Sequence, residues 1–215
     1  MTDVISGIMV AAVTAVVIVA IFFWTGQAKK KRIAALRDLC VQRGWIYRQE
    51  SGALRHGHRI EGDGWALEAV SRSSGRETAP GSSDWGHSTI WSANGEDPGR
   101  STFILGSRLG GMMDISRMPA ALLSRFLGEE IAGFQAFSAG ERLDARYVLF
   151  AREKPPAAGL LPARCEELLL AWPAQFPIVA RSSPARLSLQ LANKRLEKPG
   201  EVARFIELGE SLAAR

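Results

Sequence analysis

One apolar segment constrains the fold of this chain more than any other feature. It extends from Val4 to Trp24 without a charged residue and has the sequence VISGIMVAAVTAVVIVAIFFW. As a helix that rises 1.5 Å per residue, it would be about 31 Å long, close to the hydrocarbon thickness of a bilayer. Val and Ile favour strands in water, but within lipid only a helix satisfies the backbone polar groups of a lone segment. We therefore predict a transmembrane helix within residues 1–27.

The residues at the end of this segment predict its orientation. Three aromatic residues and then four cations occur there, namely Phe22, Phe23 and Trp24, and Lys29, Lys30, Lys31 and Arg32. Basic residues beside a span stay on the cytoplasmic side, and aromatic residues favour the membrane interface. A cleaved signal peptide would begin with basic residues and have a shorter apolar core. The prediction is a single-pass protein of the bacterial inner membrane, with its N-terminus outside and the rest in the cytoplasm.

Small residues recur inside the predicted span. Gly7, Ala11 and Ala15 are spaced four residues apart and so lie on one side of a helix. Such a stripe allows close approach of a second helix. The alternative is that Gly and Ala are simply common in spans. The stripe predicts contact with an integral membrane protein complex.

The distribution of charge argues against a nucleic-acid partner. The net charge is +5 and the isoelectric point is 9.6, but most of the excess comes from the four cations at 29–32. A charge cluster beside an apolar segment is typical of membrane electrostatics, whereas nucleic-acid binding needs a basic surface on the folded domain. The cluster is either a topology signal alone or also a site for anionic lipid headgroups.

The remaining sequence predicts a basic juxtamembrane helix over 28–43 and a cytoplasmic domain over 44–215. Gly26 is a candidate bend before this helix, and Gly44 is a natural helix stop. Alternating apolar residues and turn signals predict nine strands; they are 44–49, 58–62, 65–72, 87–93, 101–107, 133–139, 145–153, 177–182 and 186–192. Helices are expected at 118–127, at 162–172 and from 201 onward. The predicted class is α+β, an antiparallel sheet covered by helices behind the transmembrane helix.

Histidines are the first candidates for chemistry. His56 and His58 alternate along a predicted strand and so face the same way, which would let them share a metal ion with His87. The alternative is a solvated turn, since the sequence has no His-x-x-x-His or Cys-x-x-Cys spacing. Nucleophile-elbow and phosphate-loop motifs are also missing. We therefore assign no catalytic residue and no cofactor.

Trp85 lies in a Ser- and Gly-rich segment, 73–86, that lacks periodicity and predicts a long mobile loop. An aromatic side chain in such a loop is a candidate anchor for a partner protein. The alternative is a loop folded back on the sheet.

The segment RGWIYRQES follows the basic helix and contains Gly44, Trp45 and Tyr47. With the span before it and the β-rich part after it, the chain resembles a loose group of bacterial single-span, membrane-anchored proteins with a cytoplasmic α+β domain. The resemblance covers about residues 30–215 and implies no particular activity.

These features together predict an accessory, assembly or scaffolding subunit of a larger inner-membrane complex, with respiratory and photosynthetic complexes as candidates. Two other functions remain open: a membrane-anchored metal-dependent hydrolase that uses the three histidines, and an anionic-lipid surface sensor. The missing catalytic set favours a protein that is not an enzyme.

Overall fold

The computed structural model describes residues 2–73, 85–94, 101–108, 133–153 and 161–214. Residues 2–13, 15, 16, 19, 22, 85 and 192 are described by their backbone alone. Among the described residues there are nine strands, β1 (Ile46–Ser51), β2 (Arg55–Gly62), β3 (Trp65–Ser73), β4 (Trp85–Asn94), β5 (Phe103–Ser107), β6 (Gln135–Phe137), β7 (Tyr147–Ala151), β8 (Ile178–Ser182) and β9 (Arg186–Ala192). The helices are α1 (Thr2–Arg43), α3 (Ala163–Leu170) and α4 (Pro199–Ala213).

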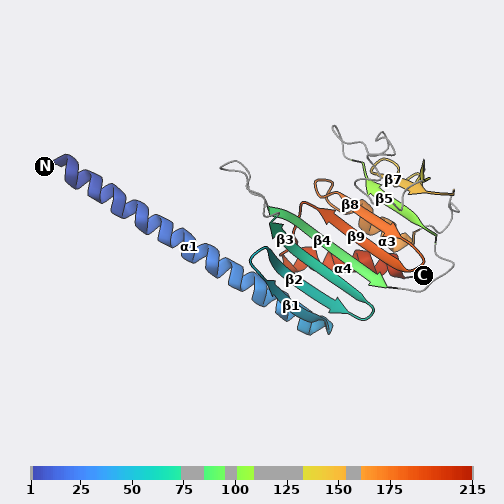
Figure 1. The fold of residues 1–215 in the computed structure, drawn as a ribbon, viewed down its shortest axis with the longest axis horizontal. Coiled ribbons are helices and arrows are strands. Elements are labelled where there is room, and N and C mark those ends of the chain that lie inside the picture. The colour runs from blue at the N-terminus through green and yellow to red at the C-terminus, as the bar shows by residue number, and fades with distance from the viewer. Residues whose placement is uncertain (1, 74–84, 95–100, 109–132, 154–160, 215) are drawn as a thin grey trace.

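The nine strands form one antiparallel sheet in the order β1-β2-β3-β4-β9-β8-β5-β7-β6 (Figure 1). The first four strands are neighbours in sequence and in space, with Gly62 paired to Trp65 at the turn between β2 and β3. The C-terminal hairpin joins the two halves of the sheet, because β9 pairs with β4 and β8 pairs with β5.

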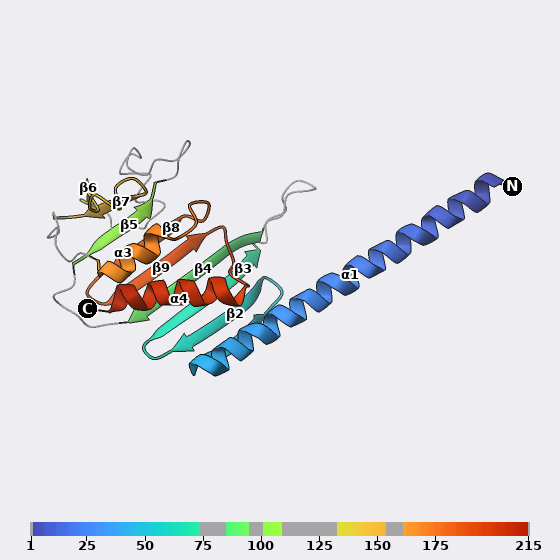
Figure 2. The ribbon, with the colours of Figure 1, turned by 180° about the vertical axis from the view of Figure 1, so that it is seen from behind.

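The main core lies between one face of this sheet and the helices (Figure 2). Helix α4 begins with a proline in its first turn, where no backbone donor is needed, and buries Val202, Phe205 and Ile206. Residues alternate between the two faces of a strand, so Leu105 joins the main core while Ile104 joins a smaller cluster with Val148 and Phe150.

Helix α1 is continuous from Thr2 to Arg43, and it passes through Gly26 without a break. Its C-terminal turns pack on the domain, where Leu36 and Cys40 are almost fully buried in the core. The N-terminal part extends away from the sheet (Figure 1). The predicted bend at Gly26 and the separate basic helix are therefore replaced by one helix.

The predicted fold class is wrong. In the described part of the chain, the structure is mostly a nine-stranded antiparallel sheet with three helices, and no helix there is long and apolar enough to cross a membrane. Crossing requires about 20 consecutive apolar residues. In α1 the side chains are described in full only from Phe23 onward, and the charges that begin at Lys29 interrupt the apolar character of that part.

The predicted strands all overlap observed ones, although their ends differ. Strand β2 begins at Arg55, earlier than expected, and β6 is restricted to Gln135–Phe137. Trp85 belongs to β4 and pairs with Ser73, so it lies at the first position of a strand and not within the expected loop. The helix expected at 118–127 and most of the loop expected at 73–86 lie outside the described residues.

Candidate functional site

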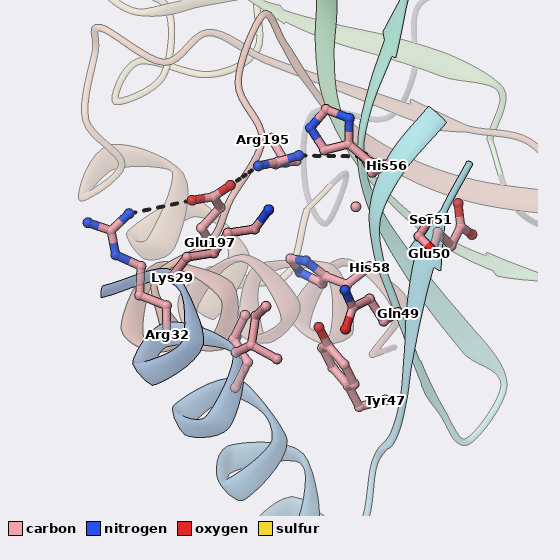
Figure 3. Close-up of a pocket in the computed structure, with 13 residues that line it drawn as sticks. Lys29, Arg32, Tyr47, Gln49, Glu50, Ser51, His56, His58, Arg195 and Glu197 are labelled. Atoms are coloured by element: carbon pink, nitrogen blue, oxygen red, sulfur yellow. Dashed lines mark hydrogen bonds and ion pairs between the residues drawn. The ribbon is translucent and has the colours of Figure 1, made fainter. Parts of the chain in front are cut away.

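A pocket with a volume of about 160 Å³ lies where α1, the edge strand β1 with its neighbour β2, and the segment between β9 and α4 meet (Figure 3). Its lining is rich in charged and polar side chains. It consists of Lys29, Arg32, Ile33, Leu36, Tyr47, Gln49, Glu50, Ser51, His56, Gly57, His58, Arg195 and Glu197.

Helix α1 contributes one face of its surface to the pocket. Lys29, Arg32, Ile33 and Leu36 follow the spacing i, i+3, i+4 and i+7, which places them on the same side of a helix. Leu36 anchors this side in the core, so Lys29 and Arg32 are held over the edge of the sheet. The neighbouring Lys30 and Lys31 are exposed and do not line the pocket.

The edge strand β1 and its neighbour β2 contribute mainly alternate residues, although Glu50 and Gly57 also border the pocket. Tyr47 and Gln49 of β1 lie beside His58 of β2, since Gln49 is the register partner of His58 and Tyr47 that of Ile60. The residues between them point to the other face of the sheet, where Arg59 binds both Glu61 and Glu68, each at 2.7 Å. The ion pairs of Arg59 are thus separated from the pocket by the sheet itself.

The segment between β9 and α4 supplies Arg195 and Glu197. Asn193 follows the last residue of β9 and has a positive φ of 59°. The chain then buries Leu196 in the core, so the residues on either side of it reach the pocket. Thr89 of β4 fixes this segment: its Oγ1 donates to the Lys194 carbonyl at 2.9 Å and accepts from the Leu196 N–H at 3.0 Å.

Positive charge exceeds negative charge in the pocket. Glu197 accepts from Arg195 and lies 3.5 Å from Arg32. Burial raises the pKa of the Glu197 carboxyl, but the hydrogen bond and charge of Arg195 outweigh that effect and lower it. Glu50 is already paired with Arg55, at 2.6 Å. Lys29 makes no ion pair with any residue that the structure describes.

His58 is the most buried polar group in the pocket. Its side chain is 5% exposed, and its ring stacks on Tyr47 with the ring centres 5.8 Å apart. Burial, followed by the positive charge of Arg195, lowers the pKa of His58 to about 4, while Glu197 opposes this shift. The imidazole is therefore neutral at pH 7. Within the described residues, its Nε2 atom has no hydrogen-bond partner.

The three predicted histidines do not converge. His56 and His58 both line the pocket. His87 lies two strands away from β2, on β4, where its Nδ1 is 2.7 Å from the Ser71 hydroxyl. In the part of the chain that is described, no group of three or more His, Cys, Asp or Glu side chains is placed to hold a metal ion.

The other predicted site residues are on α1 or β4. Gly7, Ala11, Ala15 and Phe22 belong to α1 and Trp85 to β4, but the structure does not describe their side chains. Phe23 and Trp24 are exposed on α1.

Sequence reasoning missed Tyr47, Arg195 and Glu197 as site residues. The only sequence signal for Arg195 and Glu197 was that they are charged residues on either side of an apolar one. Their approach to β2 depends on the tertiary fold. No family model, curated protein or solved structure matches the chain.

Proposed function

We propose that the protein is an accessory, assembly or scaffolding subunit of a larger membrane protein complex and acts through protein–protein contacts. The main support is the part of α1 that projects from the domain (Figure 1). Large apolar side chains are exposed on this part.

Most of these side chains share one side of the helix. Val17, Ile18, Ile21, Phe23 and Trp24 are between 49% and 79% exposed. At about 100° per residue, Val17, Ile18, Ile21 and Trp24 fall within an arc of about 120° around the helix axis, and Phe23 points to the opposite side. An apolar stripe of this width on a helix is normally packed against another element, and contiguous exposed apolar surface marks an interaction site. In this proposal, helices of the partner complex cover α1.

The cations at 29–32 support a position at a membrane surface. All four are exposed, and only four residues separate them from Trp24. Basic residues next to a membrane are attracted to anionic lipids by about 1 kcal/mol each. A partner complex in a membrane would present such lipids beside the surface that binds α1.

Site-specific photo-crosslinking tests this proposal. A photoreactive residue at Ile21 is expected to form cross-links to a partner protein in intact cells. The matched control is Val41, which lies on the same helix at 80% exposure but next to the domain, and which is expected to give none. Cross-links from position 21 to lipid alone, or the same protein captured from both positions, would contradict the proposal.

Native purification in mild detergent supplies the second measurement. The wild type and V41Q are expected to migrate with the cross-linked protein, whereas the double variant I21Q/W24Q migrates alone. If the wild type itself runs at monomer size, the subunit hypothesis fails.

A further inference from the structure

We infer that the pocket between α1, β2 and the β9–α4 segment binds a phosphate group, either free or at the end of a larger molecule such as a lipid headgroup. Side chains from three separate parts of the fold meet there: Lys29 and Arg32, His58, and Arg195 (Figure 3). This inference does not depend on the proposed role of α1 as a partner-binding helix.

The charge of the pocket matches a doubly negative group. Lys29, Arg32 and Arg195 provide three positive charges, and Glu197 offsets one of them. Glu50 is neutralised by Arg55. Two positive charges are therefore left unmatched among the described lining residues, which is the charge that a phosphate monoester complements near neutral pH.

The donor geometry also suits phosphate. Arg32 lies 3.5 Å from Glu197, so it can turn toward a ligand at little cost. Arginine presents paired N–H groups that match phosphate oxygens, and lysine acts as a point charge beside them. Both side chains reach the pocket from a helix whose next turn is fixed in the core by Leu36.

His58 provides an independent indication of a ligand. A buried polar atom without a partner is rare, because it loses its hydrogen bonds to water and gains nothing in return. His58 is 95% buried in the pocket wall, and its Nε2 has no partner among the described residues. In Figure 3 its ring points from β2 toward α1 and the charged cluster. A phosphate oxygen would accept a hydrogen bond from the neutral ring.

The size of the pocket limits the ligand. About 160 Å³ is roughly the volume that five water molecules occupy in the liquid. Pockets for whole drug-sized molecules usually measure about 300–1,000 Å³. A phosphate group therefore fits, and any larger remainder of the ligand must extend outside.

Calorimetric titration of the full chain with inorganic phosphate, in mild detergent and at constant ionic strength, tests the inference. Saturable 1:1 binding is expected, with NaCl giving no such signal. The variant K29A/R32A is expected to bind at least about tenfold more weakly, as for loss of charge-assisted hydrogen bonds. The matched control K30A/K31A removes the same charge from other sides of α1 and should keep wild-type affinity.

Two outcomes of this titration would overturn the inference. One is no saturable binding up to millimolar phosphate by the wild type. The other is equal weakening by K29A/R32A and K30A/K31A, because that result would indicate general charge attraction. All four residues are exposed, so both variants are expected to fold, and their thermal unfolding without ligand checks this.

Nuclear magnetic resonance of the His58 imidazole gives a direct readout. Phosphate is expected to shift the His58 ring signals of the wild type and to leave those of His87 unchanged. Unchanged His58 signals at saturating phosphate would place the ligand elsewhere and contradict the inference.

Vesicle flotation separates the two sources of phosphate. Binding to phosphatidic acid vesicles that K29A/R32A loses and K30A/K31A keeps assigns a lipid headgroup as the ligand. Phosphate binding in the titration, together with equal flotation of both variants, assigns a free phosphate or a water-soluble monoester.

Discussion

At the scale of single residues, His58 combines burial and charge in an unusual way. It is an ionisable group in the wall of a cationic pocket, and burial followed by Arg195 lowers its pKa to about 4 from an ordinary value of 6.5. Charged or titratable groups of α1, β1, β2 and the segment before α4 line the same pocket. They are Lys29 and Arg32 of α1, Tyr47 and Glu50 of β1, His56 of β2, and Arg195 and Glu197 before α4.

This shift predicts a loss of stability in acid. The unfolded chain protonates His58 near pH 6.5, whereas the folded protein does so only near pH 4. Between these values the unfolded state binds more protons, so the free energy of unfolding decreases as the pH falls. The contribution of His58 is complete above pH 6.5, and up to about 3 kcal/mol of it is lost by pH 4.

Urea unfolding of the wild type and H58F between pH 7.5 and pH 4 measures this effect. The phenylalanine keeps an aromatic ring against Tyr47 but cannot titrate. H58F is expected to lose clearly less stability over this range; some loss remains, because burial also lowers the pKa of His56. Parallel curves for the two proteins would contradict the prediction.

At the scale of elements, the segment between β9 and α4 determines where Arg195 and Glu197 lie. Thr89 of β4 is fully buried and satisfies two backbone groups of this segment, the Lys194 carbonyl and the Leu196 N–H. Since Leu196 is buried in the core, the position of the segment is fixed on both sides.

Thr89→Val should therefore weaken both the fold and the pocket. Valine has a similar shape but leaves both backbone groups without their partner, at a cost of about 1–3 kcal/mol for each buried group. Thr89→Ser keeps the hydroxyl and is expected to restore most of the stability. Urea unfolding measures both variants; a Thr89→Ser variant as unstable as Thr89→Val would show that the hydroxyl and its hydrogen bonds do not account for the loss.

The elements differed in how far their sequences predicted them. Strands β3, β4 and β9 were located closely, because alternating apolar residues and Gly or Pro turns are local signals. The pairing of β9 with β4 and of β8 with β5 was not predictable, since it depends on contacts between distant segments. The pocket was not predictable for the same reason. His58 was identified as a candidate, but Arg195 comes near it only through that long-range pairing.

The N-terminal helix was predicted from local signals, but with the wrong divisions. The apolar run, Gly26 and the residues before Gly44 indicated a span, a bend and a separate basic helix, whereas the described structure has one helix from Thr2 to Arg43. Residues 28–43 were correctly expected to be helical. Their packing against the sheet was not foreseen, because Leu36 and Cys40 are core residues of the domain and not part of an independent stalk.

At the scale of the whole molecule, the C-terminal turns of α1 are therefore part of the domain, and its N-terminal part projects from the domain. This division predicts different results for two truncations. A chain that begins at residue 28 keeps Leu36 and Cys40, and it is expected to unfold at the same urea concentration as the full chain. A chain that begins at Gly44 loses both buried side chains and should be less stable by several kcal/mol, at about 1.5–3 kcal/mol for a fully buried apolar side chain.

Urea unfolding followed by tryptophan fluorescence compares the two truncations. Trp65 and Trp91 lie in the sheet and remain in both, so they report on the same part of the fold. Equal stability of the two shortened chains would show that α1 contributes nothing to the domain.

The continuity of α1 has a mechanical consequence. From Leu36 back to Thr2 the helix is about 51 Å long, at 1.5 Å per residue. A tilt of only about 10° at Leu36 therefore displaces the far end by about 9 Å. Lys29 and Arg32 lie close to that pivot, where the same tilt moves them by less than about 2 Å. One rigid tilt of α1 thus produces a small displacement beside His58 and a large displacement at the N-terminus.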